Sequence, residues 1–264
     1  MRDFPKIVGV LNITPDSFSD GGCFLDTTIA VEQGISLHND GADIIDIGGE
    51  STKPGSNSVS EQQELDRVIP VIHKLKSIIP ELLISIDTSK YNVALEAVKQ
   101  GAKMINDISA LDNDSRLAGL AADWNIPLVL MHKQGTPKEM QNNPQYINVV
   151  EDIYNELKRK IEIAKNYGVT TIIADPGIGF GKTYEHNIEV LKNIDIFSNL
   201  DVPIMLGISR KAFLGHLTGI EKPQERDIAT ALLHALLLSK KIDFIRVHNV
   251  KLISLLKTLF SALK

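Results

Sequence analysis

Polar side chains recur in this sequence directly after short apolar runs, and several of them could bind one flat ring. Asp87, Asn106 and Asp175 each follow such a run. Carboxylate and amide groups accept and donate several hydrogen bonds, which suits a heterocycle that carries N–H groups and carbonyls. Lys211 could bind a carbonyl or nitrogen of the ring, and the planar guanidinium of Arg246 could stack on its face. The set predicts a pocket for a flat polar heterocycle.

Two loops near the N-terminus, residues 12–22 and 48–55, are rich in glycine, proline, serine and aspartate. Both are longer than most connections in compact α/β proteins, and such loops tend to be functional. Glycines let backbone N–H groups approach an anion closely, while Phe18 and Pro54 offer flat apolar surface for a ring. The side chains that could hold phosphate oxygens with these loop amides are Ser51, Thr52, Arg246 and His248. The expected ligand is therefore a flat polar ring joined to a phosphate.

The elements that must position these groups are eight apolar runs with helical patterns between them. The runs are Ile7–Leu11, Ile44–Ile47, Leu83–Ile86, Met104–Ile105, Leu128–Met131, Ile172–Ala174, Ile204–Leu206 and Phe244–Val247. Continuous apolar runs suit strands buried on both faces of a parallel sheet, joined by right-handed helical crossovers. Eight strand–helix units predict a single-domain (β/α)8 TIM barrel over residues 1–264.

The polar residues after these runs support a barrel, because barrel enzymes carry their chemistry at the carboxyl ends of the strands. An open doubly wound sheet is the alternative, but eight regular units leave it no obvious switch point.

Helix punctuation agrees with this count of elements. Ser60 and Gln63 predict a capping box at the start of a helix that Pro70 should kink or split. Three glycines are placed to end helices just before the next strand: Gly41, Gly101 and Gly168.

Composition narrows the class of protein. The formal net charge of −5 argues against a general nucleic-acid binder, so local cations must hold any anionic ligand. The single cysteine, Cys23, excludes an internal disulfide, favours a reducing compartment and is interpreted as an incidental surface thiol. The first apolar run is too short for a signal peptide, and Ile228–Leu238 is too short for a membrane span. We expect a soluble, cytoplasmic protein without nucleic-acid or membrane partners.

Several sequence patterns resemble functional motifs but are not interpreted as functional. Gly177–Thr183 looks like a nucleotide P-loop, but three residues separate Gly177 from Gly181 where the phosphate cradle needs four. No G-x-G-x-x-G follows a strand, so a dinucleotide cofactor is unsupported. Lys158–Lys160 is interpreted as the solvated face of a helix. Five histidines without ligand-like spacing are interpreted as surface or packing residues: His38, His73, His186, His216 and His234.

Five segments, in order and spanning essentially the whole chain, resemble the motifs of the dihydropteroate synthases. They are residues 9–22, 48–55, 175–182, 207–211 and 246–248. The combination is specific, because other pterin-binding barrels, such as the methyltetrahydrofolate methyltransferases, share the pterin-site acids and amides but not the first two loops. The resemblance implies a transferase of folate biosynthesis that sulfonamides target. Such an enzyme condenses (7,8-dihydropterin-6-yl)methyl diphosphate with 4-aminobenzoate to give 7,8-dihydropteroate and diphosphate.

The resemblance also implies roles for individual residues. The groups around the pterin would be Asp87, Asn106, Asp175, Phe180, Lys211 and Arg246. The diphosphate would be bound by Thr52, Arg246 and His248, and Asn12 would ligate a Mg²⁺ that also touches it. The aminobenzoate pocket would be lined by Phe18, Pro54 and Ser209, with Asp20 over the reacting centre. The residues implied to be catalytic are Asp20, Asp87, Asp175 and Lys211.

The implied chemistry is a dissociative substitution at the pterin methylene. Diphosphate leaves well once Mg²⁺ and cations neutralise it, and the cation left behind is delocalised into the electron-rich dihydropterin. Asp175 would keep a negative charge near that ring. The arylamine is already neutral at pH 7, so it needs positioning rather than a strong base.

Four positions depart from the usual pattern of the family. They are Lys53 for Arg, Lys133 for Met, Ala212 for Ser and Asn249 for Asp. None removes a proposed contact, so they bear on affinity and anion geometry.

A catalytically silent binding homologue stays open as an alternative, although the intact polar set argues against it. A second alternative that stays open is an unrelated phosphate-binding aldolase or isomerase barrel. Against it, no lysine at a strand end is flanked as a Schiff-base site requires.

The last two helical segments carry more apolar surface than one contact with a barrel should need. Ile228–Leu238 is apolar nearly all round, and the final segment repeats Leu252, Leu255, Leu256, Leu259 and Phe260 at helical spacing. Together with the resemblance, this predicts a homodimer through the C-terminal helices. The alternative is that these helices pack only on the barrel and on each other.

Overall fold

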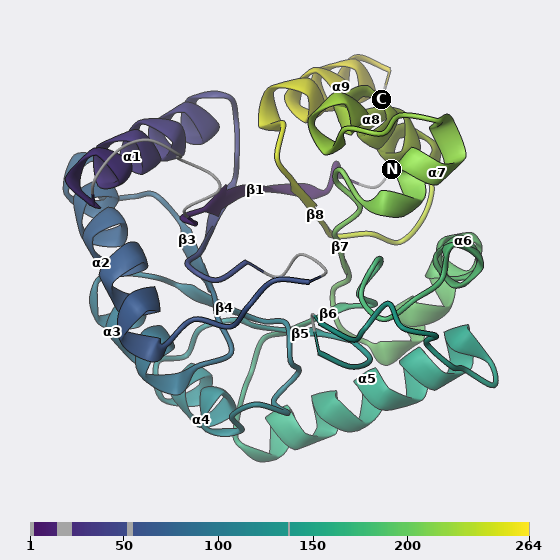
Figure 1. Cartoon of the computed structure of the whole chain (residues 1–264), viewed down its shortest axis with the longest axis horizontal. Coiled ribbons are helices and arrows are strands. Elements are labelled where there is room, and N and C mark those ends of the chain that lie inside the picture. The colour runs from purple at the N-terminus through teal and green to yellow at the C-terminus, as the bar shows by residue number, and fades with distance from the viewer. Residues whose placement is uncertain (1–2, 15–22, 52–54, 137, 264) are drawn as a thin grey trace.

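The computed structural model describes residues 3–14, 23–51, 55–136 and 138–263. In this part of the chain eight parallel strands form one sheet, in the spatial order β6–β5–β4–β3–β2–β1–β8–β7. The strands are β1 (Lys6–Asn12), β2 (Ile44–Gly48), β3 (Ile84–Asp87), β4 (Met104–Asp107), β5 (Leu128–Met131), β6 (Ile172–Asp175), β7 (Met205–Leu206) and β8 (Phe244–Val247). A bridge between Ala174 and Ile204 joins β6 to the segment before β7 and closes the ring (Figure 1). The predicted barrel is confirmed, and the open sheet is excluded.

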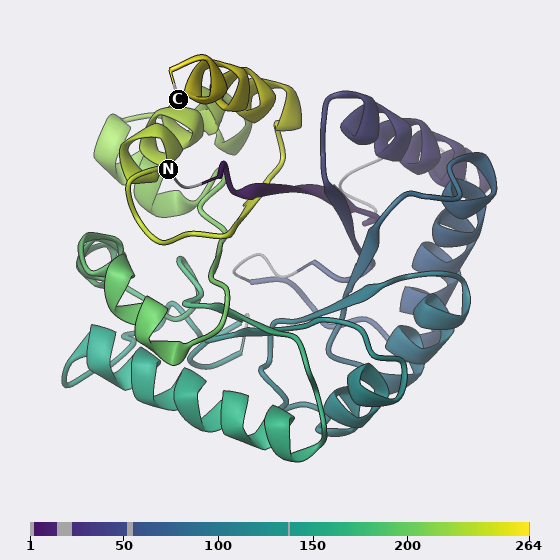
Figure 2. The same ribbon diagram turned by 180° about the vertical axis from the view of Figure 1, so that it is seen from behind.

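Helices alternate with the strands and surround the barrel on all sides, as the view from behind also shows (Figure 2). The α-helices are α1 (Cys23–Asn39), α2 (Glu61–Ile78), α3 (Tyr91–Lys99), α4 (Arg116–Asp123), α5 (Val149–Asn166), α6 (Tyr184–Lys192), α7 (Ala212–Thr218), α8 (Asp227–Leu237) and α9 (Val250–Ala262). The 3-10 helices are η2 (Ile194–Leu200) and η3 (Pro223–Arg226). None of the described helices combines the length and the apolar character that crossing a membrane requires.

Local sequence signals set several helix ends as predicted. Ser60 Oγ accepts the N–H of Gln63, and the Gln63 side chain accepts the N–H of Ser60, which forms the capping box. The three helix-ending glycines all have positive φ: Gly41, Gly101 and Gly168. Pro70 does not split α2, which rules out one of the two expected effects; the buried face of this helix keeps it continuous across the missing N–H.

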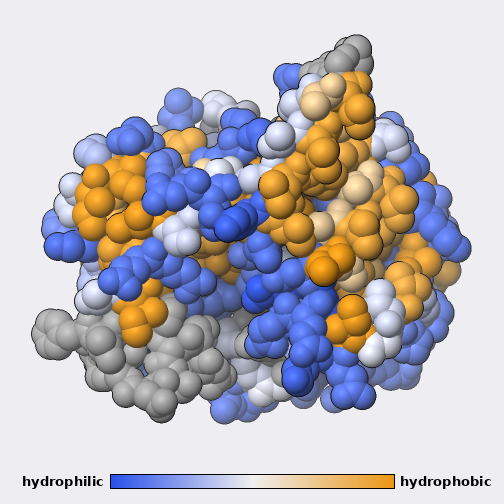
Figure 3. All heavy atoms as spheres, turned by 90° about the horizontal axis from the view of Figure 1, so that it is seen from above, coloured by the Kyte–Doolittle hydropathy of each residue, from blue (hydrophilic) through white to orange (hydrophobic). Residues whose placement is uncertain are grey.

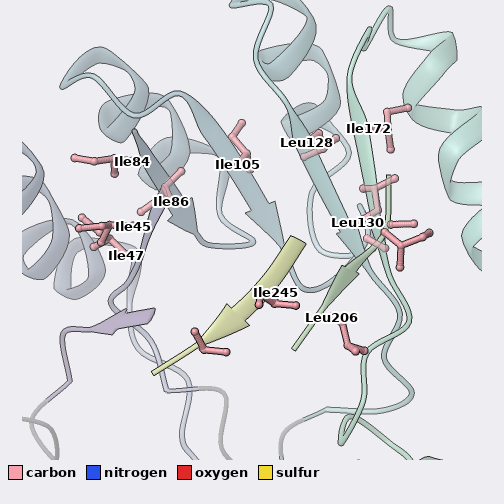
Figure 4. Close-up of a cluster of buried hydrophobic side chains, with 14 of the residues drawn as sticks. Ile45, Ile47, Ile84, Ile86, Ile105, Leu128, Leu130, Ile172, Leu206 and Ile245 are labelled. Carbon is pink, nitrogen blue, oxygen red and sulfur yellow. The ribbon is translucent and has the colours of Figure 1, made fainter. Parts of the chain in front are cut away.

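Two apolar layers hold the barrel below its mouth. The main core, part of which is drawn in Figure 4, joins strand residues such as Ile45, Ile86 and Leu130 to the surrounding helices. A separate layer inside the barrel consists of Val8, Ile44, Met104, Val129, Ile173 and Met205. Side chains two residues further along each strand face the same interior. These next positions include Asp46, Asn106, Asp175 and Arg246, so a polar layer lies directly above the apolar one.

Two details differ from the sequence expectations. The third strand runs from Ile84 to Asp87, and Leu83 stays outside it with 47% of its surface exposed. Lys160 is buried rather than solvated, and its Nζ forms an ion pair with Asp112. The sequence does not reveal this ion pair, because Lys160 is the last of three consecutive basic residues and only it falls on the buried face of α5.

Candidate active site

Arg246 on β8 pairs with two carboxylates inside the mouth of the barrel. Its Nε donates to Asp46 Oδ2 at 2.6 Å, and its Nη2 donates to Asp87 Oδ2 at 2.7 Å. Asn106 Nδ2 donates to the same oxygen of Asp46 at 2.9 Å. Strands β2, β3, β4 and β8 thus bring four polar side chains together, and three of them are predicted site residues: Asp87, Asn106 and Arg246.

Asp46 is a candidate site residue that sequence reasoning missed. It is 1% exposed, and its Oδ1 has no hydrogen-bond partner among the described residues. Leaving a buried carboxylate oxygen unpaired is costly, so this oxygen is suited to accept an N–H group of a ligand. The apolar pattern around it predicts a strand and hides the carboxylate. The available signal was a lone charge inside a run that should be buried on both faces.

Asp175 at the end of β6 and Lys211 before α7 form the other side of the site. A Cβ atom at Gly207 would lie 3.7 Å from Asp175 Oδ2 and 4.0 Å from Arg246 Cβ. Gly207 therefore lies beside both Asp175 and Arg246, and its lack of a side chain leaves space between them. Lys211 Nζ lies 3.8 Å from the centroid of the Phe180 ring, which is a cation–π contact. The structure brings the predicted residues Asp175, Phe180 and Lys211 to one place.

Burial and neighbouring charges shift the pKa values of these groups in opposite directions. Burial raises the pKa of Asp87 to about 7, although Arg246 opposes this shift. Burial also raises the pKa of Asp175, against a hydrogen bond from the Gly177 N–H and the charge of Lys211. Burial, followed by Arg246, lowers the pKa of Lys211 to about 8, while Asp175 and Asp87 oppose it. Acids and bases shifted in this way toward neutrality are typical of functional sites.

His248 follows β8 and contacts Ser209, which follows β7. The His248 N–H donates to Ser209 Oγ at 3.2 Å, which leaves the hydroxyl hydrogen for His248 Nδ1, 2.9 Å away. Burial, then Arg210 and Arg246, lowers the pKa of His248 to about 3, so the imidazole is neutral at pH 7. A neutral ring whose Nδ1 accepts carries its proton on Nε2. His248 therefore presents an N–H donor that suits a phosphate oxygen.

A second set of contacts joins the same two loops. Arg210 has a φ of +61°, and its Nε and Nη2 donate to Asp227 at 2.7 and 2.8 Å. Asn249 Nδ2 donates to Asp227 Oδ2 at 3.1 Å. Asp227 begins α8 and so ties the loop of Lys211 to the loop of His248.

A cavity of about 360 Å³ opens beside Asp87 at the carboxyl ends of the strands. Its lining includes Ser51, Ile108 and Lys133, one of the four positions that depart from the family pattern. The structure therefore places the predicted Ser51 at the mouth, on the same side as Asp87.

Asn12 ends β1 opposite Gly48 of β2. A Cβ atom at Gly48 would lie 3.6 Å from both Asn12 Oδ1 and Asp87 Oδ2, so these two oxygens flank the glycine. Within residues 3–14, 23–51, 55–136 and 138–263, no group of three or more His, Cys, Asp or Glu side chains is placed to hold a metal ion.

Several predicted residues of the first two loops lie outside the described residues, and their roles stay predictions. They are Phe18, Asp20, Thr52 and Pro54, together with the departing residue Lys53.

Comparison with known proteins identifies the family to which the chain belongs. A family profile described as "Pterin binding enzyme" matches residues 8–248. The chain is 45% identical to the dihydropteroate synthase of Clostridium beijerinckii, over 92% of this chain and 88% of that protein.

Solved structures of dihydropteroate synthase from Xanthomonas albilineans have the same fold. One was determined with 4-aminobenzoic acid; it has a TM-score of 0.92 and 39% identity, covering 99% of this chain and 93% of that one. Another is in complex with 7,8-dihydropteroate; it has a TM-score of 0.88 and 37% identity, covering 99% and 94%. Sequence, fold and site geometry agree, and the chain belongs to the dihydropteroate synthase family of pterin-binding enzymes.

Proposed function

We propose that this chain is a transferase that joins (7,8-dihydropterin-6-yl)methyl diphosphate to 4-aminobenzoate, giving 7,8-dihydropteroate and diphosphate. The observation that carries the proposal is the convergence of carboxylate, amide and guanidinium groups above the apolar floor of the barrel: Asp46, Asp87, Asn106 and Arg246. The family relationship, which covers nearly the whole chain, supports the same reaction.

The pterin ring fits the polar layer of the barrel. Asp46 Oδ1 and the carboxylate of Asp87 are acceptors for ring N–H groups, and Asn106 offers both a donor and an acceptor. Arg246 is held edge-on by its two carboxylates, which leaves the face of its guanidinium for stacking. Phe180 is 9% exposed and packs beside Lys211, so it is suited to border the ring.

The reaction breaks the bond between the pterin methylene carbon and a diphosphate oxygen, and both electrons leave with the diphosphate. The Nε2–H of the neutral His248 and the side chains of Ser51 and Thr52 are assigned to the diphosphate, with Arg246 as its nearby cation. Donors that are fixed before the reaction stabilise developing charge without reorganising. Asp175, buried near Lys211, keeps an acidic group close to the electron-poor methylene and pterin. This supports a dissociative substitution.

The aminobenzoate nitrogen then forms the new C–N bond with its lone pair and releases one proton to solvent. We assign the aminobenzoate pocket to Ser209, Phe18 and Pro54, with Asp20 over the reacting centre. The residues that we assign to catalysis are Asp20, Asp87, Asp175 and Lys211.

A Mg²⁺ ion fits the end of β1. Asn12 Oδ1 points to the side of Gly48 that also faces Asp87, and Mg²⁺ prefers oxygen ligands shared between a few protein groups and substrate phosphates. Asp87 Oδ2 already accepts from Arg246, so we assign the ion to Asn12 and diphosphate oxygens. When bound, it neutralises charge on the leaving diphosphate.

We further propose a homodimer through the C-terminal helices. The apolar band over this region is visible in Figure 3, and its most exposed residues are Ile228, Leu232 and Leu236 on α8 with Leu255 and Leu259 on α9. Part of α9 does pack inward, because Phe260 contacts Phe4 with ring centroids 5.6 Å apart. The α8 residues repeat every four positions, which makes one continuous stripe that a second copy of the chain can cover.

Product formation tests the proposed reaction. Purified protein incubated with the dihydropterin diphosphate, 4-aminobenzoate and Mg²⁺ should form 7,8-dihydropteroate, detected by mass spectrometry. The Asp175→Ala variant is the matched negative control. A wild-type protein that binds both substrates without forming product would be a silent homologue, and the proposal would be wrong.

A further inference from the structure

Lys182 is a buried lysine with no place in the reaction described above, and burial lowers its pKa to about 7. It ends the glycine-rich turn between β6 and α6 and is 2% exposed. Its Nζ donates to Gly177 O at 2.8 Å and to Phe180 O at 3.1 Å, and it lies 2.9 Å from His132 Nδ1. In its ammonium form the side chain has three hydrogens, and these three partners use all of them. The lysine of the P-loop look-alike therefore binds its own turn instead of a phosphate.

His132 links this lysine to the outer helix layer. His132 Nε2 lies 3.3 Å from Glu156 Oε2 on α5, and the hydrogen bond from His132 lowers the pKa of Glu156. An ionised Glu156 only accepts hydrogen bonds, so His132 carries its proton on Nε2 and accepts at Nδ1. Lys182 must then be the donor to His132. In this series of contacts Lys182 donates to His132, and His132 donates to Glu156.

The turn that Lys182 binds carries two groups of the site. Phe180 N–H donates to Gly177 O at 3.1 Å, and Gly177 N–H donates to Asp175 Oδ1 at 2.7 Å. Phe180 places its ring 3.8 Å from Lys211 Nζ. Gly177 has a φ of +67°, and a Cβ there would lie 1.8 Å from the backbone oxygen of His132, the residue after β5, so no other residue fits.

We propose that Lys182 is a positioning residue for the pterin ring. By donating to the carbonyls of Gly177 and Phe180, it fixes the turn that orients the Asp175 carboxylate and the Phe180 ring. It does so without touching the substrate. This inference rests on the proposed function for the identity of the ring, but the order of the turn can be measured without any substrate.

A second buried lysine provides a matched control. Lys160 is also 2% exposed, but its Nζ pairs with the carboxylate of Asp112, which lies outside the turn. Lys182→Met and Lys160→Met both remove a buried ammonium group from its acceptors. Both variants should lose stability, so a loss of pterin binding in Lys182→Met alone reports the position of Lys182.

Binding and amide hydrogen exchange of the two variants test the proposal. Lys182→Met should weaken binding of 6-hydroxymethyl-7,8-dihydropterin at least tenfold, leave the KM for 4-aminobenzoate within about twofold and speed exchange at the amides of 177–181. Lys160→Met should leave all three within twofold of wild type, and Lys182→Arg should recover part of the loss. Unchanged pterin binding and exchange in Lys182→Met would overturn the proposal.

Two further outcomes are decisive. If Lys182→Met does not fold, Glu156→Gln replaces it, because this side chain is 34% exposed and anchors only the far end of the chain of contacts. It should speed exchange at 177–181 and weaken pterin binding, and unchanged values for both would overturn the proposal. If wild type binds no pterin while exchange responds as expected, the proposed function fails and the structural role of Lys182 stands.

Discussion

Arg246 and its two carboxylates set the electrostatics of the mouth. Burial lowers the pKa of Arg246, but Asp46 and Asp87 outweigh this effect and raise it overall, so the guanidinium stays charged. One cation therefore compensates two buried acids, and burial still raises the pKa of Asp87 to about 7. A ligand that donates hydrogen bonds to these acids stabilises their ionised form.

The raised pKa of Asp87 predicts a pH dependence of pterin binding. Only the ionised carboxylate offers all its acceptor positions, so affinity for the uncharged 6-hydroxymethyl-7,8-dihydropterin should rise between pH 6 and pH 8. Asp87→Asn should lower that affinity by about 10- to 100-fold and flatten the profile. Titration calorimetry at several pH values measures both effects. A wild-type profile that is flat across this range would refute the shifted carboxyl.

The raised pKa of Asp87 makes the free energy of unfolding fall as pH rises, whereas it makes pterin affinity increase. Because the pKa of Asp87 is raised above its usual 3.8, its contribution to the free energy of unfolding is greatest below that pH. The contribution is lost as pH rises toward 7. Asp87→Asn should therefore remove part of any fall in stability between pH 4 and pH 7.

At the scale of elements, eight strand ends deliver polar groups to one mouth and the connecting loops orient them. Asp227 at the start of α8 is the clearest example, because it binds Arg210 from one loop and Asn249 from the next. This arrangement explains the amide at position 249, where the family pattern has an acid. An Asp at that position would set two carboxylates against each other.

Asn249→Asp should therefore be destabilising here. Replacing the Nδ2 donor with a carboxylate oxygen beside Asp227 should cost about 1–3 kcal/mol of unfolding free energy, measured by urea denaturation, and raise the KM for the pterin diphosphate. The double variant Asp227→Asn with Asn249→Asp restores one donor and one acceptor and should recover part of the loss. Additive losses in the double variant would contradict the pairing.

The sequence predicts the elements better than it predicts their contacts. Continuous apolar runs and helix-ending glycines gave the eight units, because burial on both faces and a left-handed backbone leave local marks. The sequence predicted that Asp87 and Arg246 share one site, because both lie at the ends of predicted strands. The contacts of Asp46 and the contact between Lys182 and His132 were not predicted, because they join residues far apart in the sequence and depend on which side chains point inward and are buried. The compartment and the absence of nucleic-acid and membrane partners stay predictions.

At the scale of the whole molecule, the exposed stripe of α8 predicts assembly. Light scattering at micromolar concentration should give twice the 29.1 kDa of one chain. Leu236→Glu should lower that mass, because a charge would enter the apolar contact, whereas Ile147→Glu should not, because this exposed side chain lies on the loop before α5. A wild-type mass of one chain would reject the dimer.

The central claim is that the barrel mouth couples loss of diphosphate from the pterin to capture by an arylamine. The most direct measurement is the rate of pyrophosphate release from the dihydropterin diphosphate, with and without 4-aminobenzoate. We predict sustained release that requires 4-aminobenzoate, matches the 7,8-dihydropteroate formed one to one and falls at least tenfold in Asp175→Ala. Absence of release in the presence of both substrates and Mg²⁺, or release of equal rate in wild type and Asp175→Ala, would contradict the account.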